Sequence, residues 1–226
     1  MSTPVHHTDL VQGTDEWLEA RRGIVTASTL GALITAKTIR PSVGETARSL
    51  VATLAAERIT GRIEPVFVSD DMLRGQMDEP RARDMYAEHT GATVTEVGFI
   101  TLGIGGAVLG YSPDGLVGDD GLIEVKSRKP KKHLQTIVSD QVPPENVAQL
   151  QAGLLVTGRA WIDYVSICGG MPLYIKRVLP DERWRDAITE AVEMAETSIV
   201  DMIARYEAAG EMPVPEYIDY FNEIEF

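Results

Sequence analysis

The residue pattern of the chain changes near Thr93, and this change constrains the fold more than any other feature of the sequence. Before Thr93, apolar residues recur at helical spacing between capping residues and glycines. After it come short runs rich in valine, isoleucine and tyrosine, separated by glycine and proline, which is typical of strands. A helical segment separates the third run from the fourth. The pattern predicts one α/β domain with a central mixed sheet flanked by helices.

The expected elements follow from this pattern. Helices are expected over 15–22, 26–34, 43–60, 69–89, 146–157 and 181–209. Strands are expected over 93–100, 107–110, 122–126, 161–167 and 173–178. Ser42, with Glu45 three residues later, predicts a capping box for the third helix, and Asn146 is the expected cap of the fifth. Pro80 is expected to kink or restart the fourth helix, because proline has no amide hydrogen. The segment 213–226 has no clear pattern.

Length and composition limit the class of protein. The 226 residues, 44% of them hydrophobic, suit a single domain over 1–226 with a large core. No apolar stretch is long enough to span a bilayer, and the first residues lack the pattern of a signal peptide, so we expect a cytoplasmic protein. Cys168 is the one cysteine, which excludes an internal disulfide and a cysteine-ligated zinc or iron–sulfur site. We expect its side chain to be buried.

The net charge of −13 argues at first against a nucleic-acid partner. The acidic excess is concentrated in the expected C-terminal helix and tail, 179–226, which hold 13 acidic and 3 basic residues. A dense basic run lies earlier, at Lys126, Arg128, Lys129, Lys131 and Lys132. Pro130 is expected to keep this run in a turn or loop. Taken alone such a run is a solvated loop, but its position beside the acidic residues described next favours a nucleic-acid contact.

Two carboxylates in the strand region, within an expected metal-site core of about 70–178, point to chemistry. Asp114 belongs to a Pro-Asp-Gly turn, and Glu124 lies ten residues later in a strand. A hairpin through 117–121 would fold Asp114 back beside Glu124. Side chains alternate along a strand, so Glu124 and Lys126 share one face while Val125 points into the core. Two oxygen ligands and one ammonium group are then expected to converge.

Such a site suits a hard cation such as Mg²⁺, which binds one or two carboxylates and leaves positions to water and a substrate phosphate. A metal-bound water is a usable nucleophile, and Lys126 could orient it or stabilise the charge that forms on phosphorus. Each motif alone is a turn or an exposed ion pair. Together they match the Pro-Asp…(Asp/Glu)-x-Lys pattern of metal-dependent nucleases, with the basic run directly downstream.

More of the chain agrees with this interpretation. The chain resembles the lambda-exonuclease family of phage recombination nucleases, the YqaJ-like group, from about Gly13 to Thr157. The matching segments are Asp15-Glu16-Trp17-Leu18, Arg21-Arg22-Gly23-Ile24-Val25-Thr26-Ala27-Ser28, Gly75-Gln76-Met77-Asp78-Glu79, Ser112-Pro113-Asp114-Gly115-Leu116, Gly121-Leu122-Ile123-Glu124-Val125-Lys126 and Ala148-Gln149-Leu150-Gln151. The Trp…Arg-x-Gly-x-x-Thr-Ala-Ser element is the most specific of them, because other nucleases of the wider superfamily do not carry it.

The resemblance implies a restriction-endonuclease-like fold and 5′-to-3′ digestion of one strand of linear duplex DNA to mononucleotides, which leaves a 3′ single-stranded tail. It also implies Mg²⁺, or Mn²⁺ in its place, with two ions, a ring-shaped homotrimer around the duplex, and a single-strand-annealing partner. By this resemblance Asp114, Glu124 and the carbonyl of Val125 are metal ligands, Lys126 is the catalytic lysine, Glu79 is a further carboxylate near the metals, and Gln149 lines the site. Pro80 makes the placement of Glu79 the least secure of these.

The resemblance further assigns Arg21, Ser28 and Ser112 to a pocket for the terminal 5′ phosphate. The residues also support this assignment directly. Ser28 is expected near the start of a helix, whose free amides and dipole favour a phosphate, and Arg21 can add a bidentate contact. Without the other motifs, helix capping and a solvated arginine would explain the same residues. A phosphate held at a fixed distance from the metals would set which bond is cut.

Other residues carry weaker predictions. Met72 lies where an apolar wedge could part the strands, although a methionine on a helix is more often core. Lys37 and Arg40 are placed to touch the duplex backbone, and so are Arg128, Lys129 and Lys131. The four histidines show no ligand spacing, and we interpret all of them as non-catalytic: His6, His7, His89 and His133.

Two other functions remain open at this point. One is another nuclease of the same superfamily: a sequence- or structure-specific endonuclease, or a helicase-linked or CRISPR-associated exonuclease. The chain has no phosphate-binding Gly-x-x-x-x-Gly-Lys loop, which argues against a helicase in this chain, and no cysteine cluster, which argues against the iron–sulfur versions. The other is a non-catalytic protein that binds DNA ends in recombination.

Overall fold

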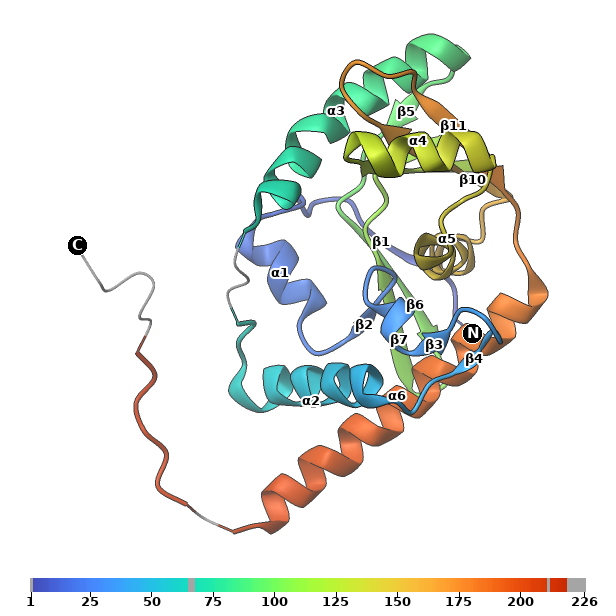
Figure 1. The fold of residues 1–226 in the computed structure, drawn as a ribbon. Helices are drawn as coiled ribbons and strands as arrows, with labels where there is room; N and C mark the ends of the chain where they lie inside the picture. Colours follow the sequence, from blue (N-terminus) through green and yellow to red (C-terminus); the bar gives the residue numbers. More distant parts are fainter. Residues whose placement is uncertain (1, 65–67, 211, 219–226) are drawn as a thin grey trace.

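The strands form two main sheets and a small hairpin (Figure 1). A computed structural model describes residues 2–64, 68–210 and 212–218. The first sheet has the order β1–β6–β7–β2, formed by Val5–His7, Phe99–Ile104, Ala107–Tyr111 and Val25–Thr26. The second has the order β11–β10–β9–β8–β5, formed by Tyr174–Val178, Trp161–Ile167, Gly121–Ser127, Gly115–Val117 and Val94–Thr95. The hairpin pairs β3 (Ile34–Thr35) with β4 (Arg40–Pro41).

Helices flank these sheets, which confirms the predicted α/β class. They are α1 (Asp15–Arg21), α2 (Glu45–Thr60), α3 (Asp70–Thr90), α4 (Pro130–Ser139), α5 (Pro144–Thr157) and α6 (Glu182–Ala208), with a short 3₁₀ helix, η1, at Leu30–Ala32. In Figure 1, α3 and α4 lie beside the second sheet, whereas α2 and α6 lie at the opposite end. Helix α5 contacts β6 and β7 of the first sheet and β10 of the second, so it lies where the two sheets meet.

Strand β9 is central to the second sheet and explains how the site is placed. It pairs antiparallel with β8 and parallel with β10, and the connection to β10 runs through α4 and α5. Leu122 packs in the main core, whereas Ile123 and Val125 pack with Ala82 and Tyr86 of α3. This alternation leaves the even-numbered residues of β9 facing away from α3.

The helix expected over 26–34 is not formed. The segment instead contains β2, η1 and β3. The hydroxyl of Thr29 donates to the main-chain oxygen of Thr26 and accepts from the amide of Thr26, so a local turn satisfies groups that a helix would use. Pairing of Val25 and Thr26 with β7 then fixes the extended conformation before this turn.

Two helix starts, and the interior of a third helix, also differ from expectation. Helix α2 begins at Glu45 with Gly44 as its N-cap, and the Ser42 hydroxyl accepts from the amide of Gly44 instead of forming a capping box. Helix α5 begins at Pro144, before the expected cap Asn146, because proline suits the first turn of a helix. Helix α3 continues through Pro80 as one segment, so the predicted restart is wrong. Packing of Ala82 and Tyr86 on the sheet stabilises the turns beyond the proline.

Helix α4 was not predicted from the sequence. Pro130 occupies its first turn, where its missing amide hydrogen costs nothing, so Lys131 and Lys132 lie in a helix and not in the expected loop. Helix α6 buries Trp184, Ile188 and Ile199 in the main core. Residues 213–218 have no regular structure, and the rest of the tail lies outside the described residues. Within the described ranges, no helix is both long and apolar enough to cross a membrane.

Candidate active site

A pocket of about 350 Å³ collects the residues that the sequence motifs single out. Its walls come from α1, the segment after β2, α3, the β7–β8 connection, β9 and α5. Nine of the predicted site residues line it: Arg21, Ser28, Glu79, Ser112, Asp114, Glu124, Val125, Lys126 and Gln149. Segments far apart in the sequence therefore meet at one place.

The hairpin of β8 and β9 brings the two carboxylates together. Gly115 pairs with Ile123, so Asp114, one residue before Gly115, lies beside Glu124. The Asp114 Oδ2 atom accepts a hydrogen bond from the amide of Val125 at 2.6 Å. Both carboxyl groups thus face the same pocket, as the spacing of the motif predicts.

Glu124 is buried, with 2% of its side chain exposed, and donors surround both of its oxygens. Its Oε1 atom accepts from Lys126 Nζ at 2.8 Å and from Gln149 Nε2 at 2.5 Å. Its Oε2 atom accepts from the Tyr111 hydroxyl at 3.0 Å. These hydrogen bonds hold the carboxylate in one orientation. Tyr111 was not predicted as a site residue; its position one residue before Ser112 is the only signal in the sequence.

The charges of the pocket suit a cation. Burial raises the pKa of Asp114 well above its usual value, and the nearby carboxylates of Glu124 and Glu79 raise it further. Burial lowers the pKa of Lys126, but Glu124 and Asp114 outweigh this effect and raise it overall. Carboxylates that oppose each other's ionisation are the expected ligands of a hard cation. Asp114, Glu124 and the main-chain oxygen of Val125 could hold such an ion.

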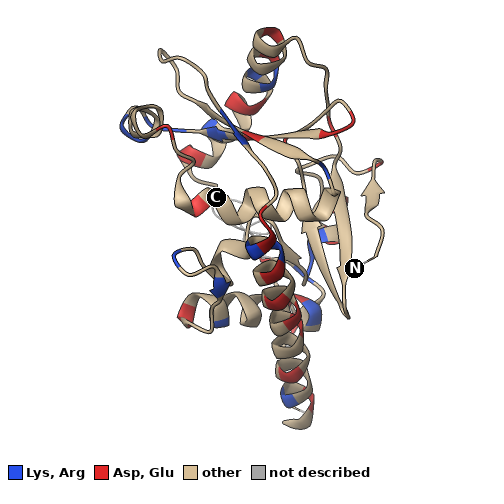
Figure 2. Ribbon diagram, turned by 90° about the vertical axis from the view of Figure 1, so that its right-hand side faces the viewer, with Lys and Arg blue, Asp and Glu red and all other residues tan. Residues whose placement is uncertain are grey.

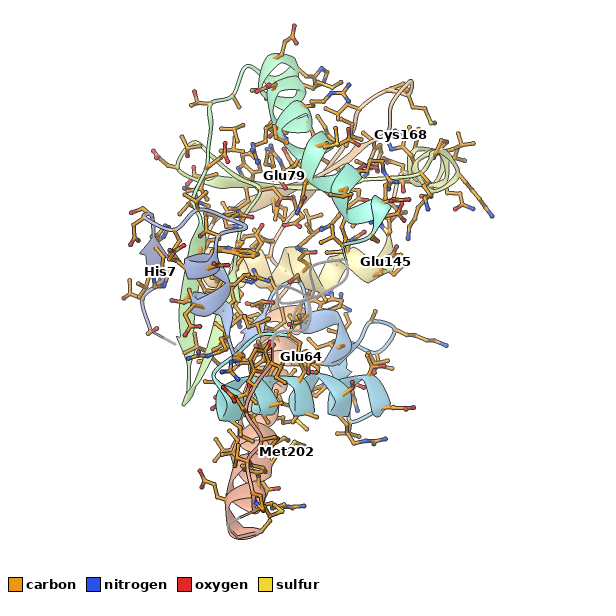
Figure 3. The ribbon with its side chains drawn as sticks, turned by 90° about the vertical axis from the view of Figure 1, so that its left-hand side faces the viewer. His7, Glu64, Glu79, Glu145, Cys168 and Met202 are labelled. Atoms are coloured by element: carbon orange, nitrogen blue, oxygen red, sulfur yellow. The ribbon has the colours of Figure 1, made fainter. Side chains whose placement is uncertain are left out.

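Glu79 lines the pocket from α3 (Figure 3) but does not join the other two carboxylates in a cluster. Its Oε1 atom accepts a hydrogen bond from Arg83 Nη1 at 2.5 Å. In the part of the chain that the structure describes, no three Asp, Glu, His or Cys side chains are grouped closely enough to hold a metal ion. The assignment of Glu79 as a ligand therefore stays a prediction.

Two of the three predicted phosphate-binding residues, Arg21 and Ser112, are hydrogen-bonded to each other. Arg21 Nη1 donates to Ser112 Oγ at 3.2 Å, and its guanidinium lies 4.1 Å from the centre of the Trp17 ring. Trp17 Nε1 also donates to Ser112 Oγ, at 2.9 Å. Burial lowers the pKa of Arg21, partly opposed by the charge of Glu57. Trp17, four residues before Arg21 on α1, was missed as a site residue although helical spacing places the two on one face.

Ser28 reaches the same pocket in a different way from that expected. It lies in the turn after β2, and its hydroxyl is 3.1 Å from that of Thr26. Because the predicted helix is absent, the argument from helix amides and a helix dipole does not apply to Ser28. Its hydroxyl is the group that remains available to a phosphate oxygen.

The six residues predicted to contact DNA lie in two different places. Met72, Arg128 and Lys129 line a second pocket of about 350 Å³, which shares Asp71 and Ser127 with the first. Met72 is 45% exposed, so the interpretation of this residue as core is wrong. The remaining three residues are exposed and line neither pocket: Lys37 and Arg40 near the β3–β4 hairpin and Lys131 on α4.

The distribution of charge agrees with the sequence. In the ribbon of Figure 2, many acidic residues (red) lie along α6, and basic residues (blue) lie at the end of the molecule that carries α4. The buried His133 lies 2.8 Å from Ser166 Oγ and 2.9 Å from the main-chain oxygen of Pro172, outside the pocket. Cys168 is buried, as predicted.

Comparisons with known proteins agree with these observations. Residues 16–160 match the model of the YqaJ-like viral recombinase domain. An alkaline exonuclease, LHK-Exo from Laribacter hongkongensis, is 33% identical to this chain, and its structure matches with a TM-score of 0.77. The match covers 87% of this chain and 97% of that chain. The structure of LHK-Exo in complex with dAMP gives the same values. A phage-related exonuclease from Haemophilus somnus 129PT, 15% identical over 81% of this chain and 96% of that chain, has the same fold, with a TM-score of 0.61. A comparison with curated proteins finds no match.

These similarities confirm the restriction-endonuclease-like fold and the resemblance drawn from the motifs. The chain belongs to the YqaJ-like viral recombinase family, in which it is similar to the lambda-type alkaline exonuclease LHK-Exo.

Proposed function

We propose that this protein is a DNA exonuclease that uses Mg²⁺ or Mn²⁺, with two ions as the expected number, to digest one strand of linear duplex DNA from its 5′ end to mononucleotides. One observation carries the proposal: a single pocket holds the Asp114–Glu124–Lys126 group and the Arg21–Ser112 group. The first group suits phosphodiester hydrolysis and the second suits a terminal phosphate. The similarity to an alkaline exonuclease whose complex with dAMP is known supports this function.

The residues of the first group have separate tasks. Asp114, Glu124 and the Val125 carbonyl would hold a divalent cation, which supplies an activated water and stabilises charge on the phosphate. The Lys126 ammonium, held 2.8 Å from Glu124, is placed to orient the attacking water and to stabilise the developing negative charge. Gln149 and Tyr111 fix the orientation of Glu124.

The second group would give the enzyme its direction. Arg21 and the hydroxyls of Ser28 and Ser112 can bind the three non-bridging oxygens of a 5′ phosphate, whereas an internal phosphodiester presents only two and carries less charge. A phosphate bound there would place the next phosphodiester at the acidic residues, so that cleavage removes one nucleotide. Directionality then follows from position alone.

Further parts of the proposal concern partners. The exposed Met72 is proposed to part the strands, and five basic side chains are proposed to contact the duplex backbone: Lys37, Arg40, Arg128, Lys129 and Lys131. A ring-shaped homotrimer would keep the enzyme on its substrate, and a single-strand-annealing protein would receive the 3′ tail. The whole chain, 1–226, is proposed to act as one nuclease domain.

The central experiment compares digestion of a linear duplex with and without 5′ phosphates, in the presence and absence of Mg²⁺. We expect Mg²⁺-dependent release of mononucleotides that is faster from phosphorylated ends. Asp114→Ala should reduce the rate by about 10³-fold or more, because it removes a proposed metal ligand. Metal-dependent digestion that persists in Asp114→Ala would refute the assignment of the site.

Arg21→Gln tests the phosphate pocket separately. It should remove most of the preference for phosphorylated ends, whereas the exposed control Arg40→Gln should leave that preference unchanged. Cleavage of closed circular DNA would instead indicate an endonuclease. Binding of DNA ends without any digestion would indicate a non-catalytic recombination protein.

A further inference from the structure

Arg83 joins three parts of the chain at the edge of the catalytic pocket. Its Nη1 atom donates to Glu79 Oε1 at 2.5 Å and to the main-chain oxygen of Asp114 at 3.1 Å. Its Nη2 atom lies 3.1 Å from Glu96 Oε2. The Arg83 side chain is only 14% exposed, and its partner Glu79 is 30% exposed, whereas Glu96 is 73% exposed, so the pair with Glu79 is the more shielded from water. No sequence motif indicated this residue.

The position of Arg83 gives it a direct role in the charge of the pocket. Four carboxylates line the pocket: Asp71, Glu79, Asp114 and Glu124. Asp71 is paired with Arg74 and Lys129. Lys126 is paired with Glu124, which leaves Arg83 as the cation bonded to Glu79. Burial raises the pKa of Glu79, and the charge and hydrogen bond of Arg83 oppose this rise. Arg83 therefore favours the ionised form of Glu79 and also holds its carboxylate.

The geometry explains why Glu79 stands apart from the other two carboxylates. Glu79 and Arg83 are four residues apart on α3, so their side chains meet on one face of the helix. The same Arg83 nitrogen also donates to the main-chain oxygen of Asp114. Arg83 therefore links Glu79 directly to one of the proposed metal ligands. Glu79 lines the same pocket as Asp114 and Glu124, so its carboxylate is the third that a cation in this pocket would meet.

We propose that Arg83 is a positioning residue that competes with a divalent cation for Glu79. This inference rests on the proposed function and extends it: a cation bound by Asp114 and Glu124 draws Glu79 away from Arg83. Arg83 then keeps its contact with the main chain of Asp114 and its pairing with Glu96. The Arg83–Glu79 ion pair must be broken before Glu79 can bind the cation, so the pair lowers the affinity of the pocket for a divalent cation.

Competition has a direction that can be measured. Arg83→Gln removes the competing charge, so the affinity for a divalent cation should rise about five- to tenfold, the order expected for one unit charge in a partly buried site. Glu79→Gln should lower the affinity. In the Glu79→Gln background, Arg83→Gln should have little further effect, because its partner is gone. Arg83→Lys keeps the charge but loses the planar fork and should give an intermediate increase.

The experiment is a titration of the full chain with Mn²⁺ alone, followed by the electron paramagnetic resonance signal of the free ion. The matched control is Arg81→Gln on the same helix, which removes an arginine that is 68% exposed and paired with Asp78 outside the pocket. The control should bind Mn²⁺ like the unmodified protein. Melting temperatures of all variants identify any loss of folding, and Arg83→Lys serves if Arg83→Gln does not fold.

Three results would overturn the inference: unchanged affinity in Arg83→Gln, weaker affinity, or an equal increase with and without Glu79. The last of these would show a general effect of charge and not competition for one carboxylate. Failure of the proposed function gives a different result, because the unmodified protein would then bind no Mn²⁺ and digest no DNA.

Discussion

At the scale of single residues, the pocket uses each charged group together with a neighbour that fixes its orientation. Glu124 is held by Lys126, Gln149 and Tyr111. Arg21 lies over the Trp17 ring, whose indole nitrogen donates to Ser112 and also to the main-chain oxygen of Gly98 at 3.1 Å. Of these positioning groups, Lys126 and Gln149 were predicted, whereas Tyr111 and Trp17 were not, because the role of an aromatic residue depends on what it contacts in the fold.

Trp17 is expected to position Arg21 and Ser112, the residues proposed to bind the 5′ phosphate. Trp17→Phe keeps an aromatic ring beneath Arg21 but removes the hydrogen bond to Ser112, so the ratio of digestion rates for 5′-phosphate and 5′-hydroxyl ends should fall about fivefold, as for one neutral hydrogen bond. Trp17→Leu should lower this ratio further, since the cation–π contact is also lost. Trp161→Phe, which alters a ring stacked on Arg177 outside the pocket, is the control. A ratio that Trp17→Phe does not change would contradict this role.

At the scale of elements, helix ends in this chain follow local side-chain chemistry. Thr14, Ser69 and Asp181 each accept a hydrogen bond from a main-chain amide at the start of α1, α3 and α6. Such caps satisfy amides that have no partner inside the helix. The helix that the sequence did not reveal, α4, begins instead with a proline in its first turn and has no side-chain cap.

The cap of α6 gives a prediction about stability and pH. Arg183 lowers the pKa of Asp181, which also accepts from the Arg183 amide at 2.9 Å. Asp181→Ala should lower the free energy of unfolding by about 1 kcal/mol at neutral pH. A carboxyl group with a lowered pKa stabilises the fold above its unfolded pKa of about 4, and this contribution is lost as the pH falls through its folded value. Urea denaturation measures the free energy of unfolding of the unmodified protein and of Asp181→Ala. The difference between these two free energies should be smaller at pH 3 than at pH 7; an equal difference at both pH values would contradict the argument.

At the scale of the whole molecule, one ion pair connects elements from both ends of the chain. Arg58 of α2 makes two hydrogen bonds of 2.7 Å to Glu196 of α6, and its Nε atom donates to the main-chain oxygen of Gly23, also at 2.7 Å. Gly23 has φ of 67°, and a Cβ atom there would lie 2.5 Å from Arg58 Cγ. The turn after α1, which follows Arg21, is thus bonded to Arg58 of α2, and Glu196 of α6 in turn holds Arg58.

Arg58→Met should lower the free energy of unfolding by about 2 kcal/mol, because a bidentate, partly buried pair is lost and Glu196 is left without its partner. Arg205→Met, which removes an exposed pair with Asp201 on the same α6, should cost less than about 0.5 kcal/mol. Equilibrium denaturation in urea measures both. Equal effects of the two substitutions would show that the Arg58 pair adds no more than a surface contact.

The sequence by itself determined the hairpin that brings Asp114 beside Glu124. Strand alternation and a short turn are local rules, so the spacing of Asp114, Glu124 and Lys126 was enough to place them together. The α/β class followed in the same way from periodicity.

Only the tertiary structure decided which distant segments reach that site. The segment 26–34 forms strands and a turn because β7 and local hydroxyls compete with a helix, and Arg83 matters because folding brings α3 against the main chain of Asp114. Hydrogen bonds between segments depend on partners supplied by the rest of the fold. For this reason they leave no periodic signal in the sequence.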